Sequence, residues 1–337
     1  MKVLLVDGNA VLHRAYYALP DWRNRSGEAT AGVYGFLSML LKAISELKPT
    51  HLAIVFDHPG PTFRHLMYVG YQVNREKERQ VSEDIWGQVD KLKIVFERMK
   101  VPVFQVEGVE ADDVIGTLCQ KLAGNSNTPH RLPPKLGGRE EGGEKKELEV
   151  IVITGDKDLM QLVNERVKLY MPQKGLSDAV LVDTNKVFEK MGVHPGQIVD
   201  YKALVGDSSD NYPGVTGIGP KTAIHLLAEY GGFEGVYRVI STSPLTPLQK
   251  FGEGNKRGEV DGTKGLSDQV IKRLINGYES GELSKRLATI KTDVPISIDV
   301  DKMKIPDEQM MMKVFEEMGY KSLMGRVIVK KNQEKLF

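Results

Sequence analysis

Short apolar segments alternate with longer segments of helical periodicity along the first half of the chain. In the short segments five or six mostly β-branched or aliphatic residues follow one another, which predicts strands at 2–6, 51–56, 101–106 and 148–153. In the longer segments apolar residues recur every three or four positions, which predicts helices at 30–47, 82–99 and 110–123. Strands that alternate with helices favour an α/β fold with a mainly parallel sheet.

The pattern changes after about residue 184, where short helices and glycine-rich turns predict a second, mainly helical subdomain. Two stretches rich in glycine, proline and charge, 124–147 and 251–265, predict solvated insertions, because neither can bury enough apolar surface to order itself. The final stretch, 321–337, carries five basic residues and one acid and is compatible with a tail or an edge strand. Ser82, followed by two acids, is the expected N-cap of the second predicted helix.

The composition is that of a soluble globular protein, with 41% hydrophobic and 27% charged residues among 337. A net charge of +1 indicates no global basic field, so a nucleic-acid partner would have to be bound through local patches. The single cysteine, Cys119, excludes an intrachain disulfide and a cysteine-based zinc site. No apolar run reaches the roughly 18 residues of a membrane span. The chain begins directly with a strand, so no leader peptide is expected.

Acidic side chains follow three of the predicted strands. Asp7 follows the first strand, Asp57 follows the second, and Asp156 and Asp158 follow the strand at 148–153. In an open parallel sheet the loops after the strands converge at one edge and form the ligand site. These acids are therefore expected to lie close together.

Two further sets of acids have helical i, i+3 spacing. Glu110 and Asp113, with Asp112 between them, open the third predicted helix, and Asp207 and Asp210 repeat the spacing in GDSSDN. So many carboxylates in one place would bind protons unless cations neutralised them. Mg²⁺ and Mn²⁺ prefer carboxylate oxygens, and two such ions can clamp a phosphodiester. A solvated loop or a helix cap is the alternative for any one acid, but for the whole set we favour metal binding.

Two segments are candidates for binding phosphate. GVTGIGPKTAIHLL (214–227) places glycines before an amphipathic helix, with Lys221 and Thr222 in its first turn, so its backbone N–H groups can hold a phosphate. An ordinary connection between helices is the alternative. The segment 61–79 interleaves arginines with aromatic residues, as a surface for single-stranded DNA does, although a solvated helix has the same pattern. Arg14 either leans over the acidic edge or is an ordinary surface charge.

These motifs resemble a known family. The runs LLVDGNAVLHRAYYAL, FDHPGPTFRH, VEGVEADDVIGTL, VITGDKDLMQLV and DYKALVGDSSDNYPGVTGIGPKTAIHLL span about residues 1 to 240. In this order they resemble the 5'-3' exonuclease domain at the N-terminus of bacterial DNA polymerase I and its flap endonuclease relatives. The resemblance implies a PIN-like α/β fold, a mainly parallel sheet flanked by helices, with a helical arch and a C-terminal helix-three-turn-helix subdomain that grips duplex DNA.

The implied divisions are a nuclease core at 1–183 with its arch at about 58–90, a helical DNA-binding subdomain at 184–300 and a C-terminal extension at 301–337. The resemblance also implies hydrolysis of a DNA phosphodiester near a 5' end, on a flap or at a nick. It implies two Mg²⁺ or Mn²⁺ ions as cofactors, often with K⁺ bound at the helix-three-turn-helix.

The resemblance assigns roles to individual residues of this chain. The positions that match metal-binding acids are Asp7, Asp57, Glu110, Asp112, Asp113, Asp156, Asp158, Asp207 and Asp210. The basic residues that match those facing the scissile and neighbouring phosphates are Arg14, Arg64 and Arg75. The DNA-gripping turn is matched by Gly217, Gly219 and Lys221, beside Thr222.

One position departs from the family pattern. Where relatives usually have a lysine at the base of the arch, this chain has Gln72, which can donate a hydrogen bond but carries no charge. We expect the loss of this charge to weaken DNA binding or slow cleavage without abolishing metal binding.

We therefore predict a structure-selective 5' nuclease that acts on DNA in replication or repair, as a monomer without a membrane partner. Because no polymerase domain follows, a stand-alone nuclease is expected. The polar insertions favour a mitochondrial or chloroplast nucleoid, reached with a leader that has since been removed, over the bacterial cytoplasm. Two alternatives stay open, a protein that binds DNA junctions without cutting them and a PIN-type ribonuclease. The set of acids argues against the first, and GVTGIGPKTA, which suits duplex DNA, argues against the second.

Overall fold

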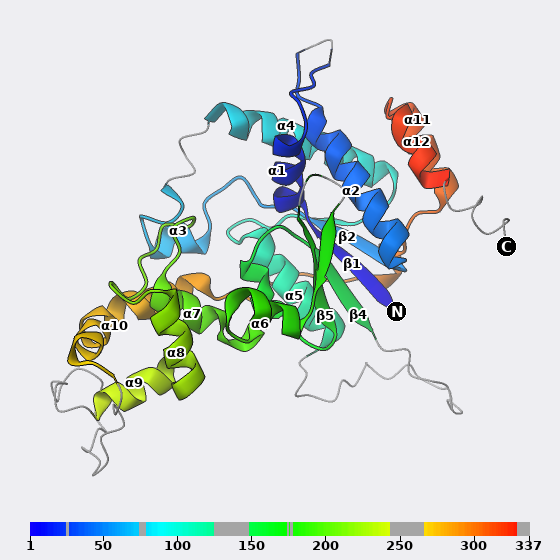
Figure 1. Ribbon diagram of the computed structural model, residues 1–337. Coiled ribbons are helices and arrows are strands. Elements are labelled where there is room, and N and C mark those ends of the chain that lie inside the picture. The colour runs from blue at the N-terminus through cyan, green and yellow to red at the C-terminus, as the bar shows by residue number, and fades with distance from the viewer. Residues whose placement is uncertain are drawn as a thin grey trace, which may run out of the picture. The chain divides into compact units, whose positions relative to one another are not determined.

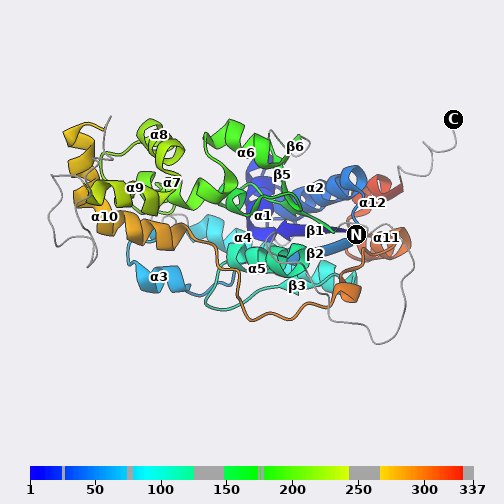
Figure 2. The same ribbon diagram turned by 90° about the horizontal axis from the view of Figure 1, so that it is seen from below.

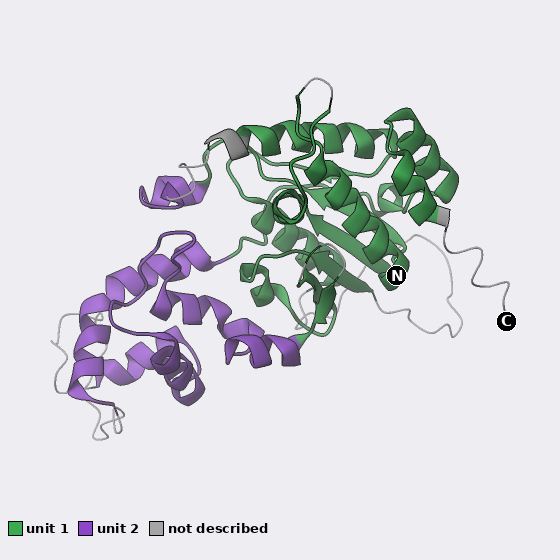
Figure 3. Ribbon diagram, turned by 45° about the horizontal axis from the view of Figure 1, so that its top comes forward, with its two compact units in different colours: residues 1–62, 78–183, 290–337 green, residues 63–77, 184–289 purple. Residues whose placement is uncertain are grey.

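The computed structural model describes residues 1–24, 27–73, 79–124, 148–173, 175, 178–242 and 266–328 (Figure 1). Arg75 and nearly all of the two expected insertions lie outside these residues. The chain divides into two compact units, each built from separate stretches (Figure 3). Unit 1 consists of residues 1–62, 78–183 and 290–337, and unit 2 consists of residues 63–77 and 184–289. Part of the expected arch thus belongs to unit 2, and the last residues of the expected helical subdomain belong to unit 1.

A six-stranded sheet forms the centre of unit 1. Its strands are β1 (Lys2–Asp7), β2 (His51–Val55), β3 (Val103–Phe104), β4 (Glu149–Ile153), β5 (Val167–Pro172) and β6 (Ala179–Val182). They lie in the order β3-β2-β1-β4-β5-β6, and all pairs are parallel except β5 with β6. The predicted α/β fold with a mainly parallel sheet is confirmed.

Both faces of the sheet are covered, which explains why its strands are continuous apolar runs in the sequence. Leu4 and Val6 of β1 belong to a core cluster that includes side chains of α1 (Gly8–Ala18), α2 (Ala31–Leu47) and α4 (Arg79–Arg98). The helix α5 (Ala111–Ala123) lies against β1, β2 and β4 on the other face (Figure 2). The core therefore holds the strand ends, and the acids that follow them, in fixed positions.

Two element ends differ from the sequence predictions. β3 is confined to Val103–Phe104, because Pro102 has no N–H with which to extend the ladder. α4 begins at Arg79, so Ser82 lies inside the helix instead of capping it.

The last part of the chain returns to unit 1. The N–H of Lys291 donates to Asp113 (2.8 Å), the N–H of Val294 donates to the Thr117 hydroxyl (3.1 Å), and the α11 helix (Glu308–Glu317) follows. The chain then forms α12 (Lys321–Ile328) rather than a tail or an edge strand, because two side chains one helical turn apart, at positions 323 and 327, are both buried. Residues 329–337 lie outside the described part.

Unit 2 is helical. Its helices are α3 (Phe63–Met67), α6 (Thr184–Met191), α7 (Ile198–Val205), α8 (Pro220–Tyr230), α9 (Phe233–Ser241) and α10 (Asp268–Ala288). Tyr71 packs with Tyr212 and Leu287 in a small apolar cluster that joins residues 63–73 to the rest of the unit. The predicted mainly helical character after about residue 184 is confirmed, although α10 is longer than the short helices expected there. No helix among the described residues is long and apolar enough to cross a membrane.

Candidate active site

Seven of the predicted acids belong to unit 1 and lie at one edge of its sheet. β1 and β4 are neighbours at the point where the strand order reverses, which is where open α/β sheets bind their ligands. Asp7 ends β1, and Asp156 and Asp158 follow β4. The other four acids of this edge are Asp57 after β2 and Glu110, Asp112 and Asp113 at the start of α5.

Asp7 is almost fully buried, with 3% of its surface exposed. One carboxylate oxygen accepts a hydrogen bond from the Ala10 N–H (3.0 Å), which caps α1, and the other accepts one from the Thr154 hydroxyl (2.7 Å). Burial raises the pKa of Asp7 to about 7, because the two hydrogen bonds offset only part of the desolvation and the charges of Asp57 and Asp156 add to it. Without a cation this carboxyl is therefore partly protonated near neutral pH.

Thr154 links the acids that follow β1 and β4. Its side chain is buried, and its hydroxyl donates to Asp7 and accepts the N–H of Asp156 (2.9 Å). Asp156 in turn accepts the N–H of Asp158 on its carboxylate (2.8 Å). The loop after β4 is thus fixed to the end of β1 by a chain of hydrogen bonds.

Asp112 carries the strongest electrostatic perturbation in this group. Its pKa is raised well above the ordinary value, first by burial and then by the charges of Asp156, Asp7, Asp158 and Glu110. These couplings join acids from β1, from the loop after β4 and from α5 in one electrostatic cluster.

Asp113 is held by main-chain donors, and metal ligation stays a prediction for it. Its side chain is fully buried, and its two carboxylate oxygens accept the N–H groups of Glu110 (3.1 Å) and Lys291 (2.8 Å). It therefore completes a capping box at the start of α5 and holds the returning segment of unit 1. Glu110 and Asp57 are also anchored, the first by the Thr62 hydroxyl (3.1 Å) and the second by the Ala111 N–H (2.7 Å).

The acid cluster of unit 1, which we define as Asp7, Asp57, Glu110, Asp112, Asp156 and Asp158, fits a hard divalent cation. All of its side chains offer carboxylate oxygens, and most are partly exposed. Burial first, and then the charges of neighbouring carboxylates, raise the pKa values of Asp7 and Asp112, so both carboxyls lack a compensating positive charge among the described residues. A bound cation would supply that charge and favour the ionised form of both carboxyls.

Replacing Asp112 by asparagine is expected to stabilise the metal-free protein at pH 8. When folding raises the pKa of a carboxyl, its contribution to stability is fully present below the unfolded-state pKa of about 3.9. That contribution is lost as the pH rises through the folded-state pKa. The gain from Asp112→Asn should therefore shrink as the pH falls towards 4. Thermal unfolding in EDTA between pH 4 and pH 8 measures it. An equal or lower melting temperature of Asp112→Asn at pH 8 would contradict the unfavourable burial and repulsion of the Asp112 carboxylate.

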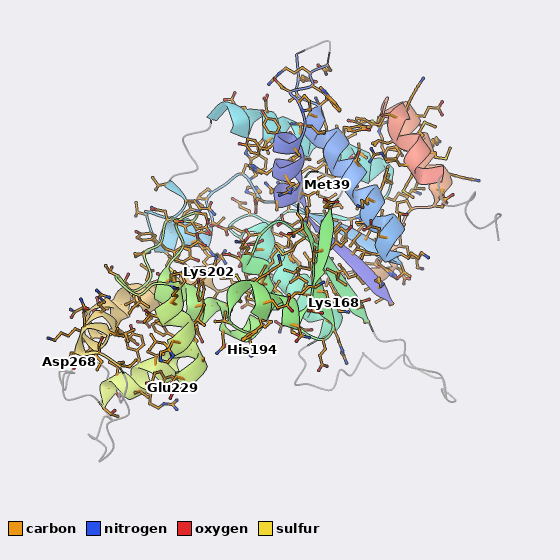
Figure 4. All side chains as sticks on the ribbon, viewed as in Figure 1. Met39, Lys168, His194, Lys202, Glu229 and Asp268 are labelled. Atoms are coloured by element: carbon orange, nitrogen blue, oxygen red, sulfur yellow. The ribbon has the colours of Figure 1, made fainter. Side chains whose placement is uncertain are left out.

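In unit 2, Asp207 is paired with a lysine. Lys202 of α7 (Figure 4) has 7% of its side chain exposed, and its ammonium lies 2.6 Å from the Asp207 carboxylate. Burial acts to raise the pKa of Asp207, but the charge and hydrogen bond of Lys202, together with bonds from Ser209, outweigh it and lower the pKa to about 2. Asp207 is therefore fully ionised at neutral pH.

Asp210 is bound by the residue that departs from the family pattern. The Gln72 side-chain amide donates to the Asp210 carboxylate (3.1 Å), and the Gln72 N–H donates to the Asp210 carbonyl (3.0 Å). In return the Asn211 side chain donates to the Gly70 carbonyl (2.7 Å). Gln72 thus fixes the acidic turn of unit 2 to the segment 63–73.

Two of the three candidate arginines are described, and both bind main-chain carbonyls. Arg14 donates to the Gln173 carbonyl after β5. Arg64 donates to the carbonyls of Leu287 (2.8 Å) and Thr289 (3.0 Å), so it holds the C-terminal end of α10. Contact with phosphate stays a prediction for both, and Arg75 lies outside the described residues.

The glycine turn before α8 is exposed. Gly217 has a φ of +84°, which favours glycine, and Gly219 is the N-cap residue of α8. Lys221 is exposed and Thr222 partly exposed in the first turn of the helix, whose N–H groups have no partner inside the helix. The turn can therefore hold an anion.

Two family models match the chain over most of its length. The model of the 5'-3' exonuclease N-terminal resolvase-like domain matches residues 2–130, and that of the 5'-3' exonuclease C-terminal SAM fold matches residues 193–310. The chain belongs to the 5'-3' exonuclease family. In this chain Asp7 and the acids of α5 fall in the first matched segment, and Asp207 and Asp210 fall in the second.

Known proteins support this assignment. DNA polymerase I of Bacillus caldotenax is 33% identical over 328 residues, which are 97% of this chain and 32% of that protein. The chain thus spans about a third of the length of the curated relatives it matches. Among solved structures, the bacteriophage T5 flap endonuclease in a complex with DNA and metal ions has a TM-score of 0.61 at 18% identity, covering 96% of this chain and 99% of that one. The catalytic core of Rad2 in complex with DNA substrate has a TM-score of 0.52 at 15% identity, covering 94% and 86%.

Sequence reasoning missed the residues that support the acids. Thr154 and Lys202 carry no motif of their own, since a threonine after a strand and a lysine in a helix are ordinary. The available signal was their spacing, two residues before Asp156 and five before Asp207. Both act on an acid through a hydrogen bond rather than on a ligand directly.

Proposed function

We propose that this chain hydrolyses DNA phosphodiesters near a 5' end as a divalent-metal-dependent 5'-3' exonuclease and flap endonuclease. The observation that carries the proposal is the acid cluster of unit 1, in which the pKa values of Asp7 and Asp112 are raised at the switch point of the sheet. A protein that only bound phosphates would gain nothing from such a concentration of negative charge. The similar structures of the T5 flap endonuclease, which contains DNA and metal ions, and of the Rad2 catalytic core, which contains DNA substrate, favour the same activity.

Metal binding is assigned to unit 1 and phosphate binding to unit 2. The acid cluster would hold the metal, Mg²⁺ or Mn²⁺ by the chemistry of its oxygens, and such ions supply an activated water and neutralise charge on the leaving oxygen. Thr154 keeps the acids that follow β1 and β4 in register. In unit 2 the turn before α8 would bind a backbone phosphate, and its carbonyl oxygens would be ligands for K⁺. The substrate would be a flap, nick or 5' end, and the active form a monomer.

Cleavage of a 5'-labelled DNA flap duplex tests the proposal. We expect products with Mg²⁺ and with Mn²⁺ and none with a chelator. Binding without cleavage in every metal would favour the junction-binding alternative, and faster cleavage of a matched RNA flap would favour the ribonuclease.

Gln72→Lys is expected to raise the cleavage rate a few-fold at saturating metal, because it adds a charge that can contact phosphate. The same ammonium can pair with the Asp210 carboxylate that Gln72 now binds, so more metal should be needed for half the maximal rate. Gln72→Met, which removes the amide without adding charge, is the matched control. Rates and metal dependence equal to wild type in Gln72→Lys would contradict both effects.

A further inference from the structure

One face of α10 is shaped to receive the glycine turn of residues 214–219, which we call the phosphate turn. Gly277 and Gly281 lie one turn apart on this face and face Val215, and a Cβ atom added to Gly277 would lie 2.6 Å from the Val215 side chain. Only glycine at that position lets helix and turn approach so closely.

Two serines of the same helix face bind the start of the phosphate turn. The Ser280 hydroxyl donates to the Gly214 carbonyl (2.7 Å), and the Ser284 hydroxyl accepts the Gly214 N–H (3.0 Å). Gly214 has a φ of +62° and a buried backbone, so its polar groups need these partners. α10 therefore holds the turn by both packing and hydrogen bonds.

Arg273 continues this face by one helical turn and reaches the exposed tip of the phosphate turn. Its Nη1 donates to the Gly217 carbonyl (3.0 Å). Its Nε would lie 2.8 Å from a Cβ atom at Gly217, so the guanidinium lies directly against the glycine. This contact keeps the Gly217 carbonyl on the side of α10.

The charge of Arg273 is not neutralised within the described part of the chain, where no carboxylate forms an ion pair with it. The side chain is partly exposed, and a guanidinium has five N–H donors, of which the Gly217 carbonyl takes one. The remaining donors form a planar fork that suits phosphate oxygens.

We infer that Arg273 is a second cationic anchor of the phosphate turn, which fixes the Gly217 carbonyl and binds the same DNA backbone phosphate as the turn. The inference rests on the proposed function, because it takes DNA as the ligand. The phosphate would then contact two positive side chains from two helices, Lys221 on α8 and Arg273 on α10. The residue acts in binding, and the acid cluster does not depend on it.

Equilibrium binding of a fluorescent DNA flap duplex in EDTA, repeated over a range of salt concentrations, tests the inference. Arg273→Gln should bind about 10-fold more weakly at 0.1 M salt, and the slope of log affinity against log salt should fall by about 1. Arg273→Lys should restore the slope. Lys272→Gln removes a neighbouring exposed charge, and it should bind nearly as wild type.

The outcomes separate the inference from the function on which it rests. An unchanged affinity and slope in Arg273→Gln would overturn the inference that Arg273 binds the DNA phosphate and fixes the turn. Weaker binding with an unchanged slope would leave Arg273 only as a support for Gly217 and would overturn the phosphate contact. If wild type and Lys272→Gln also fail to bind DNA at any salt concentration, the proposed function falls with the inference.

Discussion

Asp156→Asn is expected to lower the rate of flap cleavage by on the order of 10³-fold while DNA binding stays close to wild type. The reason is that the change removes one negative charge from the acid cluster without breaking the hydrogen bonds that hold the loop after β4. Asparagine keeps a side-chain oxygen that can accept the Asp158 N–H, as the Asp156 carboxylate does at 2.8 Å. The backbone bond from the Asp156 N–H to Thr154 is also unaffected. Single-turnover cleavage with saturating Mg²⁺, beside binding in EDTA, measures the two quantities separately.

The matched control for this experiment is Asp90→Asn. Asp90 is a mostly exposed acid of α4 whose carboxylate lies 3.7 Å from Lys93. Its removal changes the net charge by the same amount and should leave cleavage unaltered. If Asp156→Asn still cleaves at the wild-type rate, metal-dependent hydrolysis at the acid cluster is ruled out as the activity.

Lys202→Met should lower the free energy of unfolding by about 3 kcal/mol at pH 7. The substitution leaves the Asp207 carboxylate in a site where its side chain is only 14% exposed and its strongest partner is gone. Because the pair lowers the folded-state pKa of Asp207 to about 2, its stabilisation is present above the unfolded pKa of about 3.9 and is lost as the pH falls through 2. The deficit of Lys202→Met should therefore narrow below about pH 4. Urea unfolding followed by circular dichroism measures it.

Two further variants check that the loss comes from an unpaired buried charge. Adding Asp207→Asn to Lys202→Met should recover most of the stability, because the uncompensated carboxylate is then absent. Lys302→Met removes a lysine that is 78% exposed and pairs with Asp299 at 3.5 Å, and it should cost less than about 0.5 kcal/mol. A double variant as unstable as Lys202→Met would point to lost packing of the lysine stem instead.

The sequence was sufficient for β1 to β4 and for the edge at which the acids lie, whereas β5 and β6 were not predicted. Strands buried on both faces are continuous apolar runs, and the run that ends at Val6 is followed at once by Asp7. The position of an acid after a strand follows from chain direction alone. No long-range contact is needed to predict it.

What each acid does could not be predicted, because it depends on partners far along the chain. Asp113 and Asp112 are adjacent in the sequence, yet Asp113 binds the N–H of Lys291, 178 residues away, while Asp112 faces other carboxylates. Gln72 is likewise defined by Asp210, 138 residues later. Residue spacing on one helix carries no information about such pairs.

The return of the chain to unit 1 has a consequence for synthesis on the ribosome. Every residue of unit 2 has been translated by position 289, whereas unit 1 still lacks the segment that begins at residue 290. Until that segment emerges, the buried side chains of Asp113 and Thr117 have no Lys291 or Val294 N–H to bind. Since domains generally fold as units during synthesis, the second unit along the chain is expected to fold first, and the sheet that begins at residue 2 to complete its packing last.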